Sequence, residues 1–479
     1  LRGNTTADHN TGLGYAAGYA ITTGAGNTAI GSQALRATTT GAANSASGYA
    51  ALFTNVTGDS NTAQGFGALY LNTASSNSAV GAYSLFNNSS GRYNVAVGND
   101  ALYSNTTANS NTAVGYQAGY SNTTGTDLVA LGHHAGYTNQ VGYGNVYLGK
   151  SAGYAATSSV NTFVGTLAGV SVTTGERNTL IGHSAGYALT TGSNNTFIGV
   201  SASSSSGATI TTGSKNTIIG GYSGNQGGLD IRTANGYIVL SDGDGNPRQV
   251  IDGSGNLGLG VTPSAWLSGY KAIQVGNAAL SSDAADKAQV SANFYRSASN
   301  DTFIGSGYAT LYQQSGGAHK WFSSTASGTA GTTISFTQAM TLDASGNLGI
   351  GTSSPSAPLD VRGLSGLIRI TSTTGTYTTN IGFTNTGGSF YIGLDSSTGG
   401  NFGAGNYGAF LYNGANSPMV FFTNGTERAR ITSGGYFKAS NDGSYVGATS
   451  AYHELKNTID NDVVIIQATN ASYASTATS

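Results

Sequence analysis

Short apolar runs, each closed by a glycine, recur along the first half of the chain at a nearly fixed spacing. One of them is Asn27-Thr28-Ala29-Ile30-Gly31, and a similar unit returns after every 16 or 17 residues, with one longer last interval. A period too short for two helices predicts a solenoid in which each repeat forms one coil. Asn, Thr and Gly at fixed places disfavour a helix, so we predict a parallel β-solenoid of about 13 coils. The closing glycines lie at positions 14, 31, 48, 65, 81, 98, 115, 132, 149, 165, 182, 199 and 220.

The two residues before each closing glycine form two apolar columns. The residue directly before it is usually Ile, Val or Leu, as at Ile30, and the one before that is Ala or a larger apolar residue, as at Ala29 and Phe163. Because successive residues of a strand point to opposite faces, both faces of these strands are apolar. Such strands are covered on both faces, so we expect one column to fill the coil and the other to meet a partner chain. Ser47 and Gln64 interrupt one column, where weaker burial is expected.

An asparagine heads nearly every repeat. Asparagine suits a tight turn, and turn preference alone is one explanation for it. We favour a ladder, in which each side-chain amide bonds along the axis to the next coil, because Asp or Gly would serve the turn equally well. Leu128 is the clear exception. The predicted ladder residues are Asn27, Asn61, Asn94, Asn111, Asn161, Asn178, Asn195 and Asn216.

The second half of each coil changes near residue 110. Pairs such as Ala101-Leu102 give way to triplets such as Ala118-Gly119-Tyr120, so we expect the cross-section of the solenoid to change there. The aromatic rings of these triplets could stack on sugars or pack between chains, and we favour packing between chains. The tyrosines concerned are Tyr120, Tyr137, Tyr154 and Tyr187.

A longer repeat organises the second half of the chain. Residues 251–260 return at 342–351 and, in degraded form, at 431–437. Pro263 and Pro355 follow the repeated turns and mark joints. We predict small β-sandwich or β-prism-like modules, with strands at 236–241, 249–251, 309–313, 367–370, 389–392, 418–422 and 463–466 and a helical leaning only at 284–288. The predicted domains are a solenoid shaft at 1–229, a transition hairpin at 230–262, β modules at 263–353 and 354–440, and a tail at 441–479.

Composition excludes several kinds of chemistry. Among 479 residues only 8% are charged, the net charge is −2, and there is no cysteine. Disulfides, thiolate catalysis and cysteine-ligated metals are therefore excluded. No Lys/Arg cluster suggests a nucleic-acid partner, and no apolar run is long enough to suggest membrane insertion. Because the sequence begins at Leu1 without an initiator Met, we expect it to be a fragment of a longer protein.

Candidate chemical sites are few. His133 and His183 share a column but lie three coils apart, too far to share a metal within one chain; a metal on a trimer axis is the less favoured alternative to a packed or surface histidine. Residues 242–246 resemble the start of an EF-hand loop, but Pro247 and Gly253 stand where Gly and Glu are required. The sequence therefore predicts no catalytic, cofactor or metal site. The other histidines are at 9, 134, 319 and 453.

A column of threonines resembles the Thr arrays of ice-binding solenoids. Those arrays need two ranks of Thr side by side, whereas here Ala or Phe follows most of them instead, which argues against ice binding. The column consists of Thr28, Thr62, Thr112, Thr162, Thr179, Thr196 and Thr217.

The Asn-Thr-Ala-x-Gly units resemble the shorter head repeats of trimeric autotransporter adhesins, which are parallel β-rolls assembled as trimers. Combined with residues 251–260 and 349–355, they look more like tail fibres of tailed bacteriophages. That resemblance implies an elongated homotrimer in the virion tail, with the solenoid as a stiff shaft and the β modules towards the host. It also implies contacts with other tail proteins and with a glycan or protein receptor on the host cell.

Two alternatives of other classes remain open. A bacterial trimeric surface adhesin, located at the cell surface, would be supported by a membrane-anchoring barrel and a coiled-coil stalk. A tailspike that cleaves surface polysaccharide would be supported by two carboxylates within catalytic reach in a groove. We favour a structural fibre protein without catalysis or cofactor.

Overall fold

The structure is a computed structural model in which every element of the described residues is a β-strand. The chain divides into two compact units, residues 1–362 and 363–479. The all-β prediction is confirmed. The described residues are 2–200, 205–283, 286–298, 300–363, 379–386, 388–394, 404, 408–440, 453–456 and 463–466.

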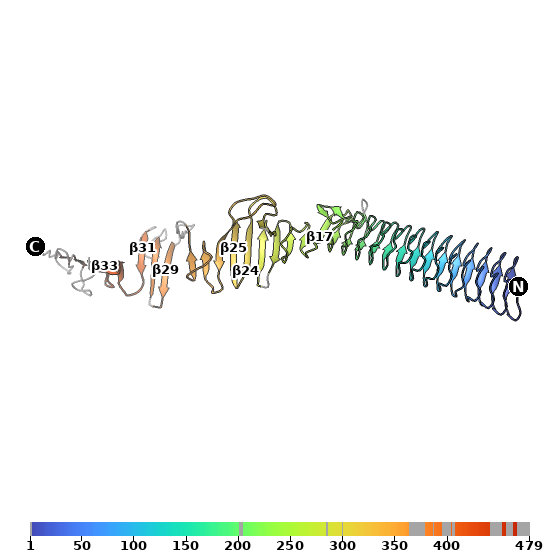
Figure 1. Cartoon of the computed structure of the whole chain (residues 1–479). Coiled ribbons are helices and arrows are strands. Elements are labelled where there is room, and N and C mark those ends of the chain that lie inside the picture. Colours follow the sequence, from blue (N-terminus) through green and yellow to red (C-terminus); the bar gives the residue numbers. More distant parts are fainter. Residues whose placement is uncertain are drawn as a thin grey trace. The chain divides into compact units, whose positions relative to one another are not determined.

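The first unit begins with the predicted parallel β-solenoid (Figure 1). Each coil contributes one three-residue strand, which pairs in parallel and in register with the strands of the coils on either side, so that Thr112 lies opposite Val129. The strands are β1 Thr11–Leu13, β2 Thr28–Ile30, β3 Ser45–Ser47, β4 Thr62–Gln64, β5 Ser78–Val80, β6 Val95–Val97, β7 Thr112–Val114, β8 Val129–Leu131, β9 Val146–Leu148, β10 Thr162–Val164, β11 Thr179–Ile181, β12 Thr196–Ile198 and β13 Thr217–Ile219.

The parallel stack continues beyond residue 229. Strand β16 (Ile238–Ser241) pairs in parallel with β13, with Thr217 opposite Ile238. The last two intervals, from Thr196 to Thr217 and from Thr217 to Ile238, each span 21 residues. The extra residues include the short hairpin of β14 (Asn225–Gln226) and β15 (Leu229–Asp230). A longer interval and the absence of a closing glycine hide this last coil in the sequence.

Antiparallel strands extend the same sheet after β16. Two parallel pairings interrupt the antiparallel order, β18 with β19 and β27 with β28. The two-stranded pair β22 (Tyr295–Arg296) and β23 (Asp301–Thr302) stands apart from it. The sheet contains β17 Pro247–Ile251, β18 Leu257–Leu259, β19 Lys271–Val275, β20 Ala278–Ser282, β21 Ala288–Ala292, β24 Thr310–Ser315, β25 Ala318–Ser324, β26 Phe336–Leu342, β27 Leu348–Ile350 and β28 Leu359–Val361.

The second unit holds two smaller sheets within its described residues. One contains β29 Thr379–Asn385, β30 Gly388–Leu394 and β31 Ala409–Asn413, all antiparallel. The other contains β32 Met419–Thr423, β33 Thr426–Ile431, β34 Phe437–Ser440, β35 His453–Lys456 and β36 Val463–Ile466.

The longer sequence repeat corresponds to a recurring structural unit. Its three copies form the hairpins β17–β18, β26–β27 and β33–β34, and in each case the next strand then pairs in parallel with the second strand of the hairpin. In the first two copies an aspartate accepts a hydrogen bond from the backbone N–H four residues later, Asp252 from Asn256 at 2.9 Å and Asp343 from Asn347 at 2.8 Å. Thr432 takes this role towards Tyr436 in the third.

Most strands predicted in the second half are confirmed, including β16, β24, β30, β32 and β36. The strand expected at 367–370 falls outside the described residues. The helical leaning at 284–288 is wrong where it can be checked, because Ala288 begins strand β21. A short run with few apolar residues is a weak helix signal, and pairing with β20 and β24 overrides it. The finer domain boundaries at 229, 262, 353 and 440 stay predictions.

Candidate functional site

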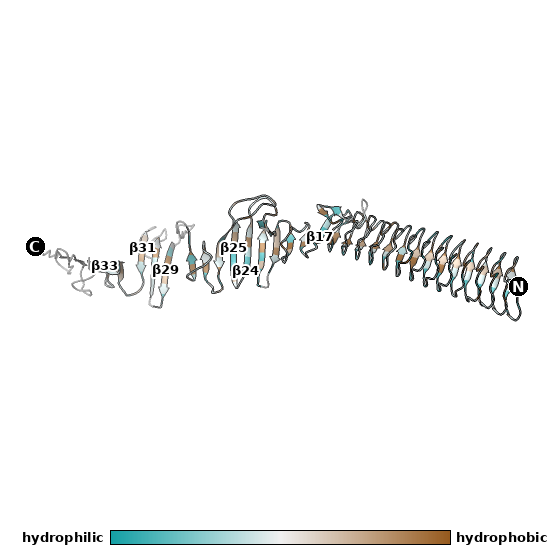
Figure 2. Cartoon of the chain, viewed as in Figure 1, coloured by the Kyte–Doolittle hydropathy of each residue, from teal (hydrophilic) through white to brown (hydrophobic). Residues whose placement is uncertain are grey.

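The strands of the solenoid separate the two apolar columns cleanly. From β2 to β13 the middle residue of the strand points into the coil and is fully buried, as at Ala113 and Phe163, whereas the residue before the closing glycine points outward. Val114 is 39% exposed and Ile198 is 36% exposed. In Figure 2 the strands are pale near the N-terminus and browner in the later coils, as the columns become more apolar. The single chain thus covers only one of its two apolar columns.

Close stacking of the coils explains the closing glycines. All thirteen have φ between +110° and +141°, a region that residues with a side chain rarely adopt. A Cβ atom on Gly115 would lie 2.6 Å from the carbonyl oxygen of Gly132 in the next coil, and one on Gly65 would lie 2.4 Å from that of Gly81. Only glycine therefore allows neighbouring coils to approach at this corner.

The interior packing changes along the solenoid while the strand ladder continues in register. In the early coils a leucine such as Leu102 fills the interior beside a small alanine of the strand. In the later coils a glycine replaces that leucine, and a large residue of the strand, such as Tyr147 or Phe163, occupies the space. A Cβ atom on Gly153 would lie 2.5 Å from the ring of Tyr147. The interior therefore changes in two steps: glycine replaces the leucine from Gly119, and the middle residue of the strand becomes larger than alanine from Tyr147.

The predicted ladder asparagines lie inside the solenoid, fully buried or nearly so. Each side-chain oxygen accepts a hydrogen bond from the backbone N–H at the same position of the next coil, as when Asn111 N–H donates to Asn94 at 3.0 Å. Most side-chain amides donate to a carbonyl at another corner of the next coil, as from Asn178 to Gly192 at 2.9 Å. The asparagine side chains thus bond mainly to backbone groups of the neighbouring coils. The backbone bonds within the column, including those of Asn27, Asn61, Asn94, Asn111, Asn161, Asn178, Asn195 and Asn216, continue through Asn10, Asn44, Asn77, Asn145 and Tyr237.

The structure contains a second asparagine ladder that was not predicted from the sequence. Its members are buried, and their side chains bond directly to one another, as from Asn88 to Asn72 and from Asn105 to Asn88, both at 2.7 Å. The signal was present, because these residues also recur every 16 or 17 positions, five or six residues before the first ladder. Apolar residues such as Val172 and Leu189 continue the column in later coils. The second ladder consists of Asn55, Asn72, Asn88, Asn105, Asn122 and Asn139.

Seven aromatic rings of successive coils stack on one another along the surface. Neighbouring ring centroids are 4.9–5.4 Å apart and the planes differ by 12° or less. Arg36 lies over the first ring, 5.2 Å from its centroid. Tyr120, Tyr137 and Tyr154 thus stack within their own chain, whereas Tyr187, beyond Val170, lies outside the stack and is 47% exposed. The stack consists of Phe53, Tyr70, Phe86, Tyr103, Tyr120, Tyr137 and Tyr154.

The histidines form no metal cluster in the described part of the chain. The rings of His133 and His134 lie 3.9 Å apart, and His134 shares a hydrogen bond of 3.0 Å with Gln117. Burial, followed by the nearby His133 and Lys150, lowers the pKa of His134.

Residues 242–246 form a hairpin turn in which the Asp242 carboxylate accepts a hydrogen bond from the backbone N–H of Asn246 at 2.9 Å and another from the Arg248 side chain.

The outer face of the solenoid carries two ranks of residues. Because the middle residue points inward, the first residue of a strand, most often Thr, lies beside the last, most often Ile, Val or Leu. Thr112 and Val114 are one such pair. The residue that follows a threonine in the sequence, such as Ala113 after Thr112, points inward and is therefore not its neighbour on the outer face. The true neighbour is an apolar rank without charge.

Comparison with known proteins adds no assignment. No protein-family model matches the chain, and no curated protein matches it either. Within the described residues there is no helix of the length and apolarity needed to cross a membrane.

Proposed function

We propose that this chain is a fibre subunit of a phage tail, which associates through the outer face of its solenoid and holds a host-attachment region away from the virion. The observation that carries the proposal is the exposed column before the closing glycines, in which Val, Ile and Leu recur at one residue per coil. A periodic apolar column of this kind is expected to be covered by other copies of the chain. The resemblance to trimeric fibres sets the expected number of copies at three.

The internal ladders support a mechanical role. Both asparagine ladders and the aromatic stack run along stretches of the solenoid and join neighbouring coils there. A solenoid is held by contacts between neighbouring repeats, so these bonds resist separation and bending of the coils. Other tail proteins and a glycan or protein receptor on the host cell are the proposed partners, and the virion tail is the proposed location.

Light scattering on the purified protein tests the association. The expected mass is three times the 48.0 kDa of the chain, and a monomeric mass would contradict the proposal. The combined substitution Val114→Lys and Ile181→Lys places charges on the outer face, and we expect it to lower the mass, because like charges buried at an interface repel. Val141→Lys is the matched control, since Val141 is 61% exposed and lies in a turn away from the strands. Its mass should stay unchanged.

Immunogold labelling tests the location. Antibodies raised against the purified chain should label the tails of phage particles from the source culture. Labelling of bacterial envelopes without labelling of particles would instead support the surface adhesin.

A further inference from the structure

The outer face of the solenoid continues beyond the last coil. Each residue of a row directly opposes the next one across the pairings from β16 to β28, beginning with Ile238 opposite Ile251 and ending with Ile350 opposite Val361. Since opposed residues of a sheet share a face, the row lies on the same face as Thr217, which opposes Ile238. We call it the central row: Ile238, Ile251, Leu257, Ile273, Leu280, Val290, Tyr312, Trp321, Met340, Ile350 and Val361.

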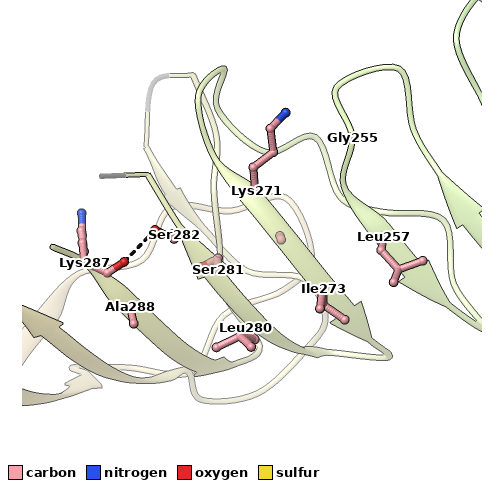
Figure 3. A pocket seen from close by; sticks show the side chains of 10 residues that line it. Gly255, Leu257, Lys271, Ile273, Leu280, Ser281, Ser282, Lys287 and Ala288 are labelled. Carbon is pink, nitrogen blue, oxygen red and sulfur yellow. Dashed lines mark hydrogen bonds between the residues drawn. The ribbon is translucent and has the colours of Figure 1, made fainter. Parts of the chain in front are cut away.

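The side chains of the central row are exposed or half-buried in the single chain. Val290 is 55% exposed, Leu280 50% and Ile273 43%. Figure 3 shows Leu257, Ile273 and Leu280 in a line across β18, β19 and β20, where they border a shallow pocket of about 480 Å³. Lys271 and Lys287 also line this pocket.

Strands β19–β21 have the reverse of the usual arrangement. The face that the chain itself covers carries polar residues, including Gln274, Gln289 and Ser291, all at most 4% exposed. Gln289 bonds to Gln313 at 3.0 Å, so these groups are satisfied within the chain. Beside them only the small Ala272 and Ala279 are buried, and the larger apolar residues of these strands face outward. Monomeric proteins bury apolar residues and expose polar ones, and the reversal therefore indicates that another surface covers the outward face.

A second copy of this chain fits that face in charge and in polarity. The outward positions of the paired strands from β1 to β28 include no Asp or Glu and one Lys, Lys271 at the start of β19, so repulsion between two such faces is confined to that exposed lysine. Their polarity also varies along the chain: Ser47 and Gln64 form a polar stretch between Ile30 and Val80, whereas Tyr312 and Trp321 lie near the end of the unit. Parallel copies in register match polar with polar and apolar with apolar, whereas antiparallel copies would oppose them.

We infer that copies of this chain associate in parallel and in register along the whole of the first unit, with the central row as the continuation of the solenoid interface. The inference rests on the proposed self-association and extends it from the shaft to β28. The antiparallel strands are then part of the same shared core, and their apolar face is buried only in the assembly.

Single cysteines test this directly, because the chain has none of its own. Full-length variants Val290→Cys in the central row, Val114→Cys in the solenoid and Thr325→Cys in an exposed turn would react with a charged maleimide, in native buffer and in denaturant. We expect Val290→Cys and Val114→Cys to react at least about tenfold more slowly in native buffer than in denaturant, as protected sites do. Thr325→Cys should react rapidly in both.

The outcomes separate the inference from the proposed function. A slow Val114→Cys with a fast Val290→Cys would overturn the inference and leave the fibre proposal standing. Fast reaction at both positions, with a monomeric mass, would overturn both. A short bismaleimide should also join copies of the Val290→Cys chain to one another, because parallel copies in register place Val290 opposite itself. Failure to join them while Val114→Cys chains are joined would contradict the shared register.

Discussion

The ring of Phe163 lies so close to the backbone of Gly169 that a Cβ atom on this glycine would come within 2.6 Å of the ring. In the early coils the same two positions hold alanine and leucine, as at Ala96 and Leu102. Leu102 has a φ of +50°, close to the +57° of Gly169, so both versions use one backbone conformation. The solenoid therefore has two interchangeable ways to fill its interior.

This relationship predicts strong coupling between the two positions. Phe163→Ala alone leaves a cavity and should lower the free energy of unfolding by about 3–5 kcal/mol. Gly169→Leu alone clashes with the ring and should also destabilise. The double variant recreates the early-coil packing, so the two effects should cancel in part, with a coupling of about 2–3 kcal/mol. Denaturant unfolding of the four proteins measures it; simple additivity would show that the positions pack independently.

The closing glycines should tolerate no side chain. Gly115→Ala must place a Cβ atom against the carbonyl of Gly132 at an unfavourable φ, and we expect a loss of at least about 2–3 kcal/mol in unfolding free energy. Gly144→Ala is the matched control. Its φ is +63°, no atom lies within 4 Å of the added Cβ, and Ala43 occupies the same place in another coil at φ +55°. It should cost only about 1–2 kcal/mol; equal losses would contradict the role of coil stacking.

Removal of one asparagine from the second ladder should be costly. Asn88→Ala deletes the partner of both Asn72 and Asn105 in the buried interior. Unpaired buried polar groups cost about 1–3 kcal/mol, so thermal unfolding should occur at a clearly lower temperature. An unchanged transition would mean that water or other groups replace the lost bonds.

Thr38 occupies the same column one coil before Asn55, and it should respond in the opposite direction. It is fully buried, and within the described part of the chain its hydroxyl oxygen has no hydrogen-bond partner. Thr38→Val keeps the shape and removes the unpaired group, so we expect stabilisation of about 1 kcal/mol. A lower unfolding temperature for this variant would show that the hydroxyl does find a partner in solution.

The turn at Asp242 should give a pH-dependent contribution to stability. The backbone N–H of Asn246, followed by Arg248, lowers the pKa of Asp242 to about 2 from its usual 3.8. A lowered pKa in the folded state stabilises above the unfolded value, and the effect is lost as pH falls through the folded value. Asp242→Asn should therefore be less stable than the parent at pH 7, and the difference should shrink between pH 3.8 and about 2. A difference that does not change with pH would contradict the prediction.

The solenoid was predictable because its constraints repeat. Glycine, asparagine and the apolar columns each recur at one period, so every repeat indicates the same shape for one coil. The coil that ends in β16 was missed because Tyr237 replaces the asparagine and the spacing lengthens to 21 residues. The second ladder was not predicted because its asparagines lie outside the repeated unit at the strand and give way to Val172 and Leu189 in later coils. The sequence alone also could not say which apolar column points inward, since both have suitable side chains.

The antiparallel strands show a different limit. Gln289 and Val290 would ordinarily be read as outward and inward residues, and the structure reverses them. The covered face is set by the loops around Trp266 and Phe294, which pack over it and lie outside the repeated segments. Long-range packing of this kind leaves no periodic trace in the sequence.

The glycine corners also affect how such a gene changes length. Recombination between two repeats that joins one closing glycine to the equivalent glycine of another coil removes or adds a complete coil and leaves every interior column in phase. A shorter insertion or deletion would place a side chain at a corner that only glycine fits. The solenoid can therefore lengthen or shorten in steps of one coil, about 4.8 Å each, without changes to the residues of the remaining coils.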